Sequence, residues 1–252
     1  MLRNWLVSKE RALRSRLERA EGEEGFTLIE MSIVLVIIGL LIGGVLKGQE
    51  LIASTRLKTT VSQWDAAKAS INGFIDKFSN LPGDYNLATT YLSVNGVNNG
   101  DGDGTIGTAV VTGNWNSANV GADGTENLNA WAHMAAAGLI AGVTIKSGAV
   151  GAQSAASGGV LMGKISGTSW AVVHGVAQTT SSVWARLQGG TGAPTPSLSA
   201  KQAAEIDRKY DDGVSTSGSI VSDDNETCTT SSNGVYNALQ TTNACVMAFN
   251  LQ

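Results

Sequence analysis

The residues best suited to chemistry in this chain are the oxygen-bearing side chains of a glycine-rich stretch, NNGDGDGTI at residues 98–106. When the stretch is aligned on an EF-hand loop, Asn99, Asp101 and Asp103 occupy the first, third and fifth ligand positions. Thr105 occupies the position that supplies a main-chain carbonyl. Because hard oxygen ligands at this spacing suit Ca²⁺, the sequence predicts a candidate calcium site here.

The acidic residue that normally closes such a loop is missing, since Val110 stands at its position. A distant carboxylate such as Asp123 or Glu126 would be needed to complete the coordination shell. The alternative is a turn that binds no ion, because Asn, Gly and Asp favour turns for conformational reasons alone. The sequence leaves both interpretations open, and calcium is the one cofactor that it indicates.

Signals for catalysis or nucleic-acid binding are weak elsewhere in the chain. Residues 158–164 match the opening of a phosphate-binding loop, but Ile165 replaces the Ser or Thr that would hold magnesium. His133 and His174 have no cysteine or paired carboxylates near them in sequence. The formal net charge of -4 provides no basic footprint for nucleic acid. We therefore expect neither an enzyme, a hydrolase included, nor a nucleic-acid-binding protein.

The elements that must position the loop begin with a long apolar segment, Phe26–Leu46, which contains one ionisable residue, Glu30. As a helix it spans about 30 Å, the thickness of the hydrocarbon core of a bilayer. A carboxylate at mid-membrane costs about 2.5 to 3.5 kcal/mol, and less near the interface, which indicates a partner for Glu30. Residues 1–25 carry six Lys or Arg and no apolar run, so they are not a secretory signal peptide and favour a cytoplasmic N-terminus.

Residues 47–80 are predicted to continue this helix as an amphipathic stretch. Apolar residues recur there at helical spacing, at Leu57, Val61, Trp64, Ile71, Ile75 and Phe78. The helix should stop before Pro82 and Gly83, because proline disfavours helical backbone in the residue before it and the glycine favours a turn.

Residues 81–252 are predicted to form one globular head of the α+β class, with a small antiparallel sheet packed on the long helix. Helices are expected over 126–140, ending near Gly142, and over 200–210, where Ser199 and Gln202 are spaced as a capping box. Short strands are expected at residues 159–165, 170–177, 182–187 and 245–251.

The sequence GFTLIE at residues 25–30, followed by the apolar run, closely resembles the cleavage signal of type IV pilins and of type II secretion pseudopilins. The resemblance implies that a prepilin peptidase cuts between Gly25 and Phe26, N-methylates Phe26 and removes the cytoplasmic leader 1–25. It also implies that Glu30 pairs with the Phe26 amine of a neighbouring subunit inside a filament, where a buried charge is tolerated when paired.

The same resemblance implies a structural role. The subunit would wait in the inner membrane with its head in the periplasm, until an assembly platform and its ATPase extract it into a filament with copies of itself or other pilins. The leading interpretation is a subunit of a type IV pilus-like filament, and the alternative is a pseudopilin of a type II secretion system. An alternative of another class is a membrane-anchored periplasmic binding module that never polymerises and that tolerates substitution of Glu30.

The chain contains two cysteines, Cys228 and Cys245. In an oxidising periplasm, such a pair in a polar, turn-rich region is most simply a disulfide, and it resembles the C-terminal disulfide loop of many pilins. Two free buried thiols are the alternative. A metal site is disfavoured because neither histidine lies nearby in sequence.

Overall fold

The computed structural model describes residues 26–107, 111–112, 126–146, 158–177, 180–189, 195–222, 227–230, 234–240 and 242–252. The chain divides into two compact units, Met1–Ala53 and Ser54–Gln252. The expected leader 1–25, Gly25 included, lies outside the described residues.

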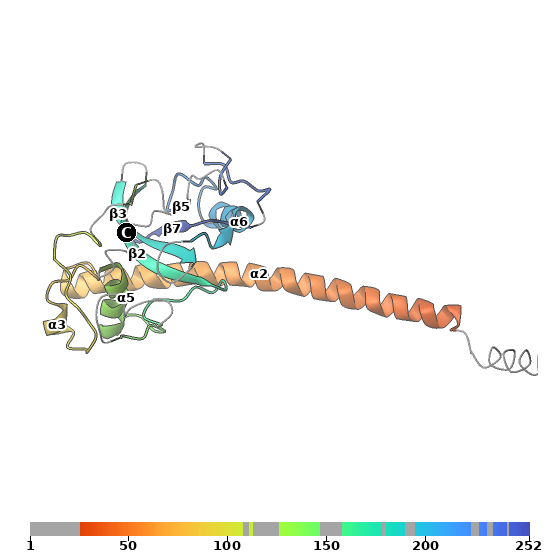
Figure 1. Ribbon diagram of the computed structural model, residues 1–252, viewed down its shortest axis with the longest axis horizontal. Helices are drawn as coiled ribbons and strands as arrows, with labels where there is room; N and C mark the ends of the chain where they lie inside the picture. The colour runs from red at the N-terminus through yellow and green to blue at the C-terminus, as the bar shows by residue number, and fades with distance from the viewer. Residues whose placement is uncertain are drawn as a thin grey trace, which may run out of the picture. The chain divides into compact units, whose positions relative to one another are not determined.

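Helix α2 (Leu28–Phe78) contributes residues to both units and is the long helix in Figure 1. In the first unit, every residue from Phe26 to Lys47 is exposed. The most apolar window of α2 has a mean hydropathy of 2.6 and no buried residue, so within the described residues this helix is long and apolar enough to cross a membrane. The helix ends where predicted: Ser79 has a left-handed backbone, with a φ of 53°, and Pro82 follows.

In the second unit, α2 buries one face in the main core. The predicted apolar stripe is confirmed, because its members are either buried or packed against the core. The buried face also contains residues that the stripe left out, namely Thr60, Ala67, Ser70 and Phe74. The two hydroxyl groups among them lose no hydrogen bond on burial, since Thr60 donates to the carbonyl of Arg56 and Ser70 to that of Ala66.

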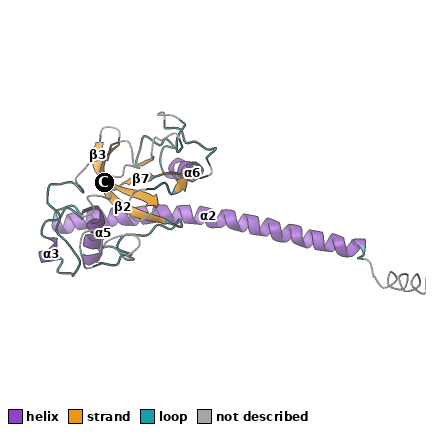
Figure 2. Ribbon diagram, viewed as in Figure 1, coloured by secondary structure: helices purple, strands orange, loops and turns teal. Residues whose placement is uncertain are grey.

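Two sheets complete the head (Figure 2). The larger one has the order β1-β2-β3-β7-β5, formed by β1 (Val111–Thr112), β2 (Thr168–Ala177), β3 (Thr180–Gly189), β7 (Met247–Asn250) and β5 (Ile220–Ser222). The pairs from β2 to β5 are antiparallel, and β1 adds a parallel edge to β2. The smaller sheet pairs β4 (Leu198–Ser199) with β6 (Asn243–Cys245). The predicted α+β class, a long helix with a small antiparallel sheet, is confirmed.

Strand β7 lies between β3 and β5 and forms part of the contact between the sheet and α2. The ring centroid of Phe249 lies 5.6 Å from that of Trp64 on α2 and 5.2 Å from that of Trp170 on β2. The Trp64 indole N–H donates to the carbonyl of Asn250 over 2.8 Å, so the indole packs with its one donor satisfied.

The described residues of the head include three short helices, α3 (Ala88–Tyr91), α5 (Glu126–Ala136) and α6 (Ala200–Tyr210). The capping box at the start of α6 is confirmed, with Ser199 and Gln202 each bonded to the other's backbone N–H. Helix α5 ends at Ala136, four residues earlier than predicted. Gly138 adopts a left-handed φ of 73°, and its N–H and that of Leu139 satisfy carbonyls of the last turn, an arrangement that stops a helix.

Two strand predictions were wrong in detail. In place of a strand over 159–165, Met162 alone forms an isolated bridge, with Ser169. A Cβ on Gly163 would lie 1.9 Å from the Thr168 hydroxyl, so the chain turns too tightly there for an extended ladder. The predicted strand over 245–251 is divided at Val246 into β6 and β7, which belong to different sheets. The parallel edge strand β1 was not predicted.

Candidate functional site

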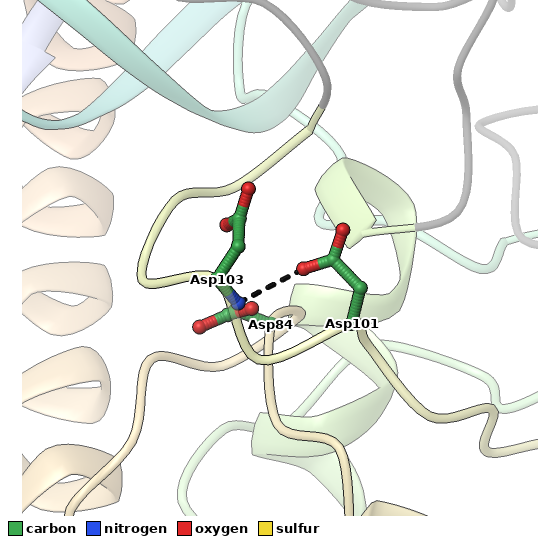
Figure 3. A group of neighbouring side chains, drawn as sticks. All are labelled: Asp84, Asp101 and Asp103. Atoms are coloured by element: carbon green, nitrogen blue, oxygen red, sulfur yellow. Dashed lines mark hydrogen bonds between the residues drawn. The ribbon is translucent and has the colours of Figure 1, made fainter.

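Three carboxylates converge at the loop that follows α2. One side-chain oxygen from each of Asp84, Asp101 and Asp103 lies within 4.8 Å of the other two. Figure 3 shows them meeting from two segments, Asp84 from the turn after α2 and the other two from the glycine-rich loop. Asp101 and Asp103 belong to the predicted calcium site, whereas Asp84 was not predicted as a ligand. We call these three residues the first acidic cluster.

Backbone N–H groups of the loop fix the orientation of the first acidic cluster. Asp84 accepts from Gly102 over 2.7 Å through one oxygen and from Gly104 over 3.0 Å through the other. Asp101 accepts from the N–H of Asp103 over 3.0 Å, the dashed line in Figure 3. In the described part of the chain, the second oxygen of Asp101 accepts no backbone hydrogen bond. The loop therefore wraps around Asp84 and leaves oxygen atoms of its own carboxylates for another partner.

The other two predicted ligands use their side chains for local contacts. The Asn99 side-chain oxygen accepts from the N–H of Thr89 over 2.8 Å. The Thr105 hydroxyl donates to Asp103 over 2.7 Å, and the Thr105 N–H donates to the same Asp103 oxygen. These contacts shape the loop, so the geometry adds support to Asp101 and Asp103 as ligands but none to the Asn99 side chain.

Glu126, the first residue of α5, supports the loop from outside. One of its carboxylate oxygens accepts from the N–H of Asp101 over 2.9 Å, and the other accepts from the N–H of Gly107 over 2.8 Å. The sequence had offered Glu126 or Asp123 as the residue that completes the shell. Glu126 instead contacts backbone at both ends of the loop, and Asp123 lies outside the described residues.

Burial raises the cost of charge on Asp84 and Glu126, whereas the hydrogen bonds from Thr105 lower the pKa of Asp103. The pKa of Asp84 is raised mainly by burial and further by the charges of Asp103 and Asp101, while the N–H bonds from Gly104 and Gly102 oppose the shift. The pKa of Glu126 is raised mainly by burial as well. A hard cation placed among these oxygens would offset the repulsion, and an all-oxygen set is what Ca²⁺ takes in proteins.

At the start of the apolar segment, the local hydrogen bonds centre on Glu30. One carboxylate oxygen of Glu30 accepts from both the N–H and the hydroxyl of Thr27, over 2.8 and 2.7 Å. The Glu30 N–H points back to the Thr27 hydroxyl, at 3.3 Å. This reciprocal pair is a capping box at the start of α2, and it leaves the second Glu30 oxygen unused among the described residues. Phe26 is 79% exposed beside it.

The two cysteines are bonded: Cys228 and Cys245 form a disulfide between residues 17 apart in sequence. The bond is buried and closes a loop that contains Tyr236. The Tyr236 hydroxyl donates to Asp207 of α6 over 2.7 Å. Asp207, Asp211 and Asp212 form a second acidic cluster, which the sequence analysis did not single out as a site.

The family model of the prokaryotic N-terminal methylation motif matches residues 22–46. The match covers the cleavage signal and the apolar segment and leaves the head outside it. No curated protein and no solved structure matches the chain. Residues 22–46 are therefore the signal that type IV pilins and pseudopilins carry.

Proposed function

We propose that this chain is a structural subunit of a type IV pilus-like filament. In this proposal the prepilin peptidase cuts between Gly25 and Phe26 and methylates the new N-terminus. The processed subunit waits in the inner membrane with its head in the periplasm, and an assembly platform with its ATPase then moves it into the filament. The methylation motif supports this class, since proteins that carry it are structural subunits.

One observation carries the proposal: the apolar half of α2 is exposed along its whole length and begins with a carboxylate. Such a surface is unfavourable in water and needs lipid or other helices around it. The hydrocarbon interior of a bilayer accommodates the apolar side chains, but it offers no cation to Glu30. A bundle of identical helices satisfies both, because each Glu30 would meet the Phe26 amine of a neighbour.

The capping box gives this pairing a definite geometry. Thr27 occupies one oxygen of Glu30, so the carboxylate is held in one orientation while its other oxygen remains for the neighbouring amine. A charged pair that is also hydrogen-bonded tolerates burial far better than a lone carboxylate. Glu30 would therefore set the axial register between subunits.

The test combines mass spectrometry with substitution of Glu30. Protein from the native membrane should start at Phe26 with one added methyl group only when the peptidase is present. Glu30→Leu should insert into the membrane normally but form no filaments. Glu50→Gln, which changes an exposed carboxylate of the same helix, is the matched control and should still assemble.

Filaments from Glu30→Leu at the wild-type level would refute the role of Glu30. An uncut chain with or without the peptidase would instead favour the membrane-anchored binding module. The location of the filaments distinguishes the pilus from the pseudopilin alternative. Antibody against the head should label filaments on intact cells if they are pili, and only after the outer membrane is opened if they form a periplasmic pseudopilus.

We further propose that the head binds Ca²⁺ through the first acidic cluster. The observation that favours it is the convergence of Asp84 with Asp101 and Asp103, which brings together carboxylates from two segments of the chain. Their oxygens, with main-chain carbonyls and water, would supply the shell. Calcium would tie the turn after α2 to the glycine-rich loop.

Thermal unfolding of the full chain in detergent tests calcium binding. A ligand at about 100 times its Kd stabilises the folded state by about 2.7 kcal/mol, so Ca²⁺ should raise the Tm relative to a chelator. Mg²⁺ should do so less, because it demands a more regular octahedral shell. Asp101→Asn should abolish the response, while Asp76→Asn, an exposed position on α2, should keep it. No shift in the wild type would refute the calcium proposal.

A further inference from the structure

The fully buried imidazole of His133 has an unambiguous protonation pattern. The Gly83 N–H lies 2.9 Å from Nδ1 and can only donate, so Nδ1 is the acceptor and carries no proton. Nε2 lies 2.7 Å from the carbonyl of Asn98, which can only accept, so Nε2 carries the proton. The ring is therefore neutral, with both nitrogens satisfied.

The two partners of this ring lie just ahead of the carboxylates of the first acidic cluster. Gly83 directly precedes Asp84, and Asn98 lies shortly before Asp101 on the other segment. The ring also stacks on Phe74 of α2, with centroids 6.0 Å apart and planes 20° apart. His133 thus joins α2, the turn that follows it and the glycine-rich loop.

Backbone packing makes the spacing of these two segments sensitive to small shifts. A Cβ on Gly100 would lie 2.3 Å from the carbonyl oxygen of Gly83 and equally close to the Asp84 backbone. The segments therefore touch without an intervening side chain. Glu126 lies on α5, the helix that also carries His133, and its carboxylate accepts from the N–H groups of Asp101 and Gly107. Helix α5 therefore holds the loop through two side chains, those of Glu126 and His133.

We propose that His133 is the positioning residue of the cation site. By accepting from Gly83 and donating to Asn98, it fixes the distance between Asp84 and the pair Asp101 and Asp103. The inference rests on the calcium binding proposed above and adds to it a residue that touches no ion. Groups that orient metal ligands from behind typically contribute about 10-fold to 100-fold in affinity.

Two substitutions separate the two hydrogen bonds. His133→Asn keeps an acceptor near the position of Nδ1 and loses the donor to Asn98. His133→Gln keeps a donor near the position of Nε2 and loses the acceptor for Gly83. The control is Trp131→Phe, which removes a buried hydrogen bond from the same helix to the carbonyl of Trp170, away from the loop.

The measurements are the Kd for Ca²⁺ and the hydrogen exchange of residues 83–107, both on the full chain in detergent. We expect each His133 variant to bind Ca²⁺ about 10-fold more weakly and to exchange faster in this segment. Trp131→Phe should lower the Tm, because it removes a hydrogen bond and leaves a cavity in the core, but it should leave the Kd within about 2-fold. Unchanged Kd values in both His133 variants would overturn the proposal.

If the wild type binds no Ca²⁺, the calcium proposal fails, and hydrogen exchange alone then decides about His133. Exchange over 83–107 that matches the control would overturn the positioning role, and faster exchange would support it. The wild type also gives a test that needs no variant. The chain has two histidines, so ¹⁵N spectra of the imidazoles are simple to read. A proton on Nδ1 of His133 would overturn the proposal whether or not the variants fold.

Discussion

Among the described residues, the head contains two clusters of three aspartates that look alike by composition and by the closeness of their oxygens but are built differently. In each, side-chain oxygens lie within 4.8 Å of one another and one residue is buried, Asp84 in the first cluster and Asp207 in the second. The first cluster joins two segments through backbone N–H groups of a glycine-rich loop. The second cluster lies at the end of α6 and within a single turn.

The second cluster is satisfied almost entirely by the protein. Asp207 accepts from the Tyr236 hydroxyl and from the N–H of Gly213. Asp212 accepts from the N–H of Val214 and from the hydroxyl of Ser217 through separate oxygens. These carboxylates build a turn and have little left to offer an ion. The hydrogen-bond donors around a cluster of carboxylates, rather than its acidity, therefore decide whether it resembles a binding site.

The largest expected effect comes from removing the covalent support of the second cluster. Replacing Cys228 and Cys245 by alanine should cost about 3 kcal/mol of stability, because the disulfide closes a loop of 17 residues. Denaturant unfolding in detergent measures the loss. Calcium affinity should stay unchanged, since the first cluster is held by α5. A parallel loss of calcium affinity would show that the two clusters are not independent.

Removing the phenol that faces Asp207 should have the next largest effect. Tyr236→Phe leaves a buried carboxylate oxygen without its donor, at a cost of about 1 to 3 kcal/mol. Tyr210→Phe is the control, because Tyr210 is 37% exposed and should lose almost nothing. Equal stability of the two variants would mean that the Asp207 contact contributes nothing.

A matched pair of single substitutions compares the clusters directly. Asp212→Asn should lower stability by about 1 kcal/mol through weaker turn contacts and should keep the full rise of the Tm with Ca²⁺. Asp101→Asn should change stability little without Ca²⁺ and lose that rise. Thermal melts of both variants with and without Ca²⁺ test this prediction. If Asp212→Asn instead loses the rise of the Tm and Asp101→Asn keeps it, the ion binds at the second cluster.

The two regions should also differ in the sign of their pH dependence, and the opposed contributions leave the smallest net effect in the wild type. Burial raises the pKa of Asp207 to about 6, so the folded state holds a proton that the unfolded state has lost above its ordinary value of 3.8. The stabilisation that this proton binding contributes to the folded state is complete below pH 3.8 and is lost as the pH rises through 6. Burial lowers the pKa of His133 from 6.5 to about 4, so its contribution is complete above 6.5 and is lost as the pH falls.

Between pH 4 and 6 the two contributions oppose each other and flatten the stability profile. Asp207→Asn should therefore make stability rise more steeply with pH, and His133→Gln should make it fall. Chemical denaturation across this range measures both slopes. Identical slopes in the wild type and both variants would contradict the assignment of these two groups.

Local signals made the long helix and α6 predictable from sequence. Pro82 and Gly83 end the first, and the capping pair Ser199 and Gln202 starts the second, so each boundary depends on residues adjacent to it. The early end of α5 was missed because Gly138 and Gly142 offer the same signal, and only the hydrogen bonds of the final turn choose between them. The division of the last strand at Val246 depends on which sheet each half joins, which no local pattern contains.

The candidate site was half predictable for the same reason. Asp101 and Asp103 lie in a motif with ligand spacing, whereas Asp84 reaches them only because Gly100 lets two backbones touch. His133 carries no sequence signal at all. The nearest hint was the turn signal of Pro82 and Gly83, which indicated a helix end rather than a ligand. Contacts between distant segments are what sequence spacing cannot express.

The position of β7 also governs when the head can fold. Residues 247–250 follow the other described strands in sequence, yet they fill the gap between β3 and β5 and reach back to Trp64. Until they arrive, β3 and β5 have no ladder between them and α2 lacks part of its packing surface. Contacts so distant in sequence form slowly, so until β7 pairs with both neighbours the larger sheet stays incomplete and open to proteases. The head therefore closes only once β7 has joined both β3 and β5.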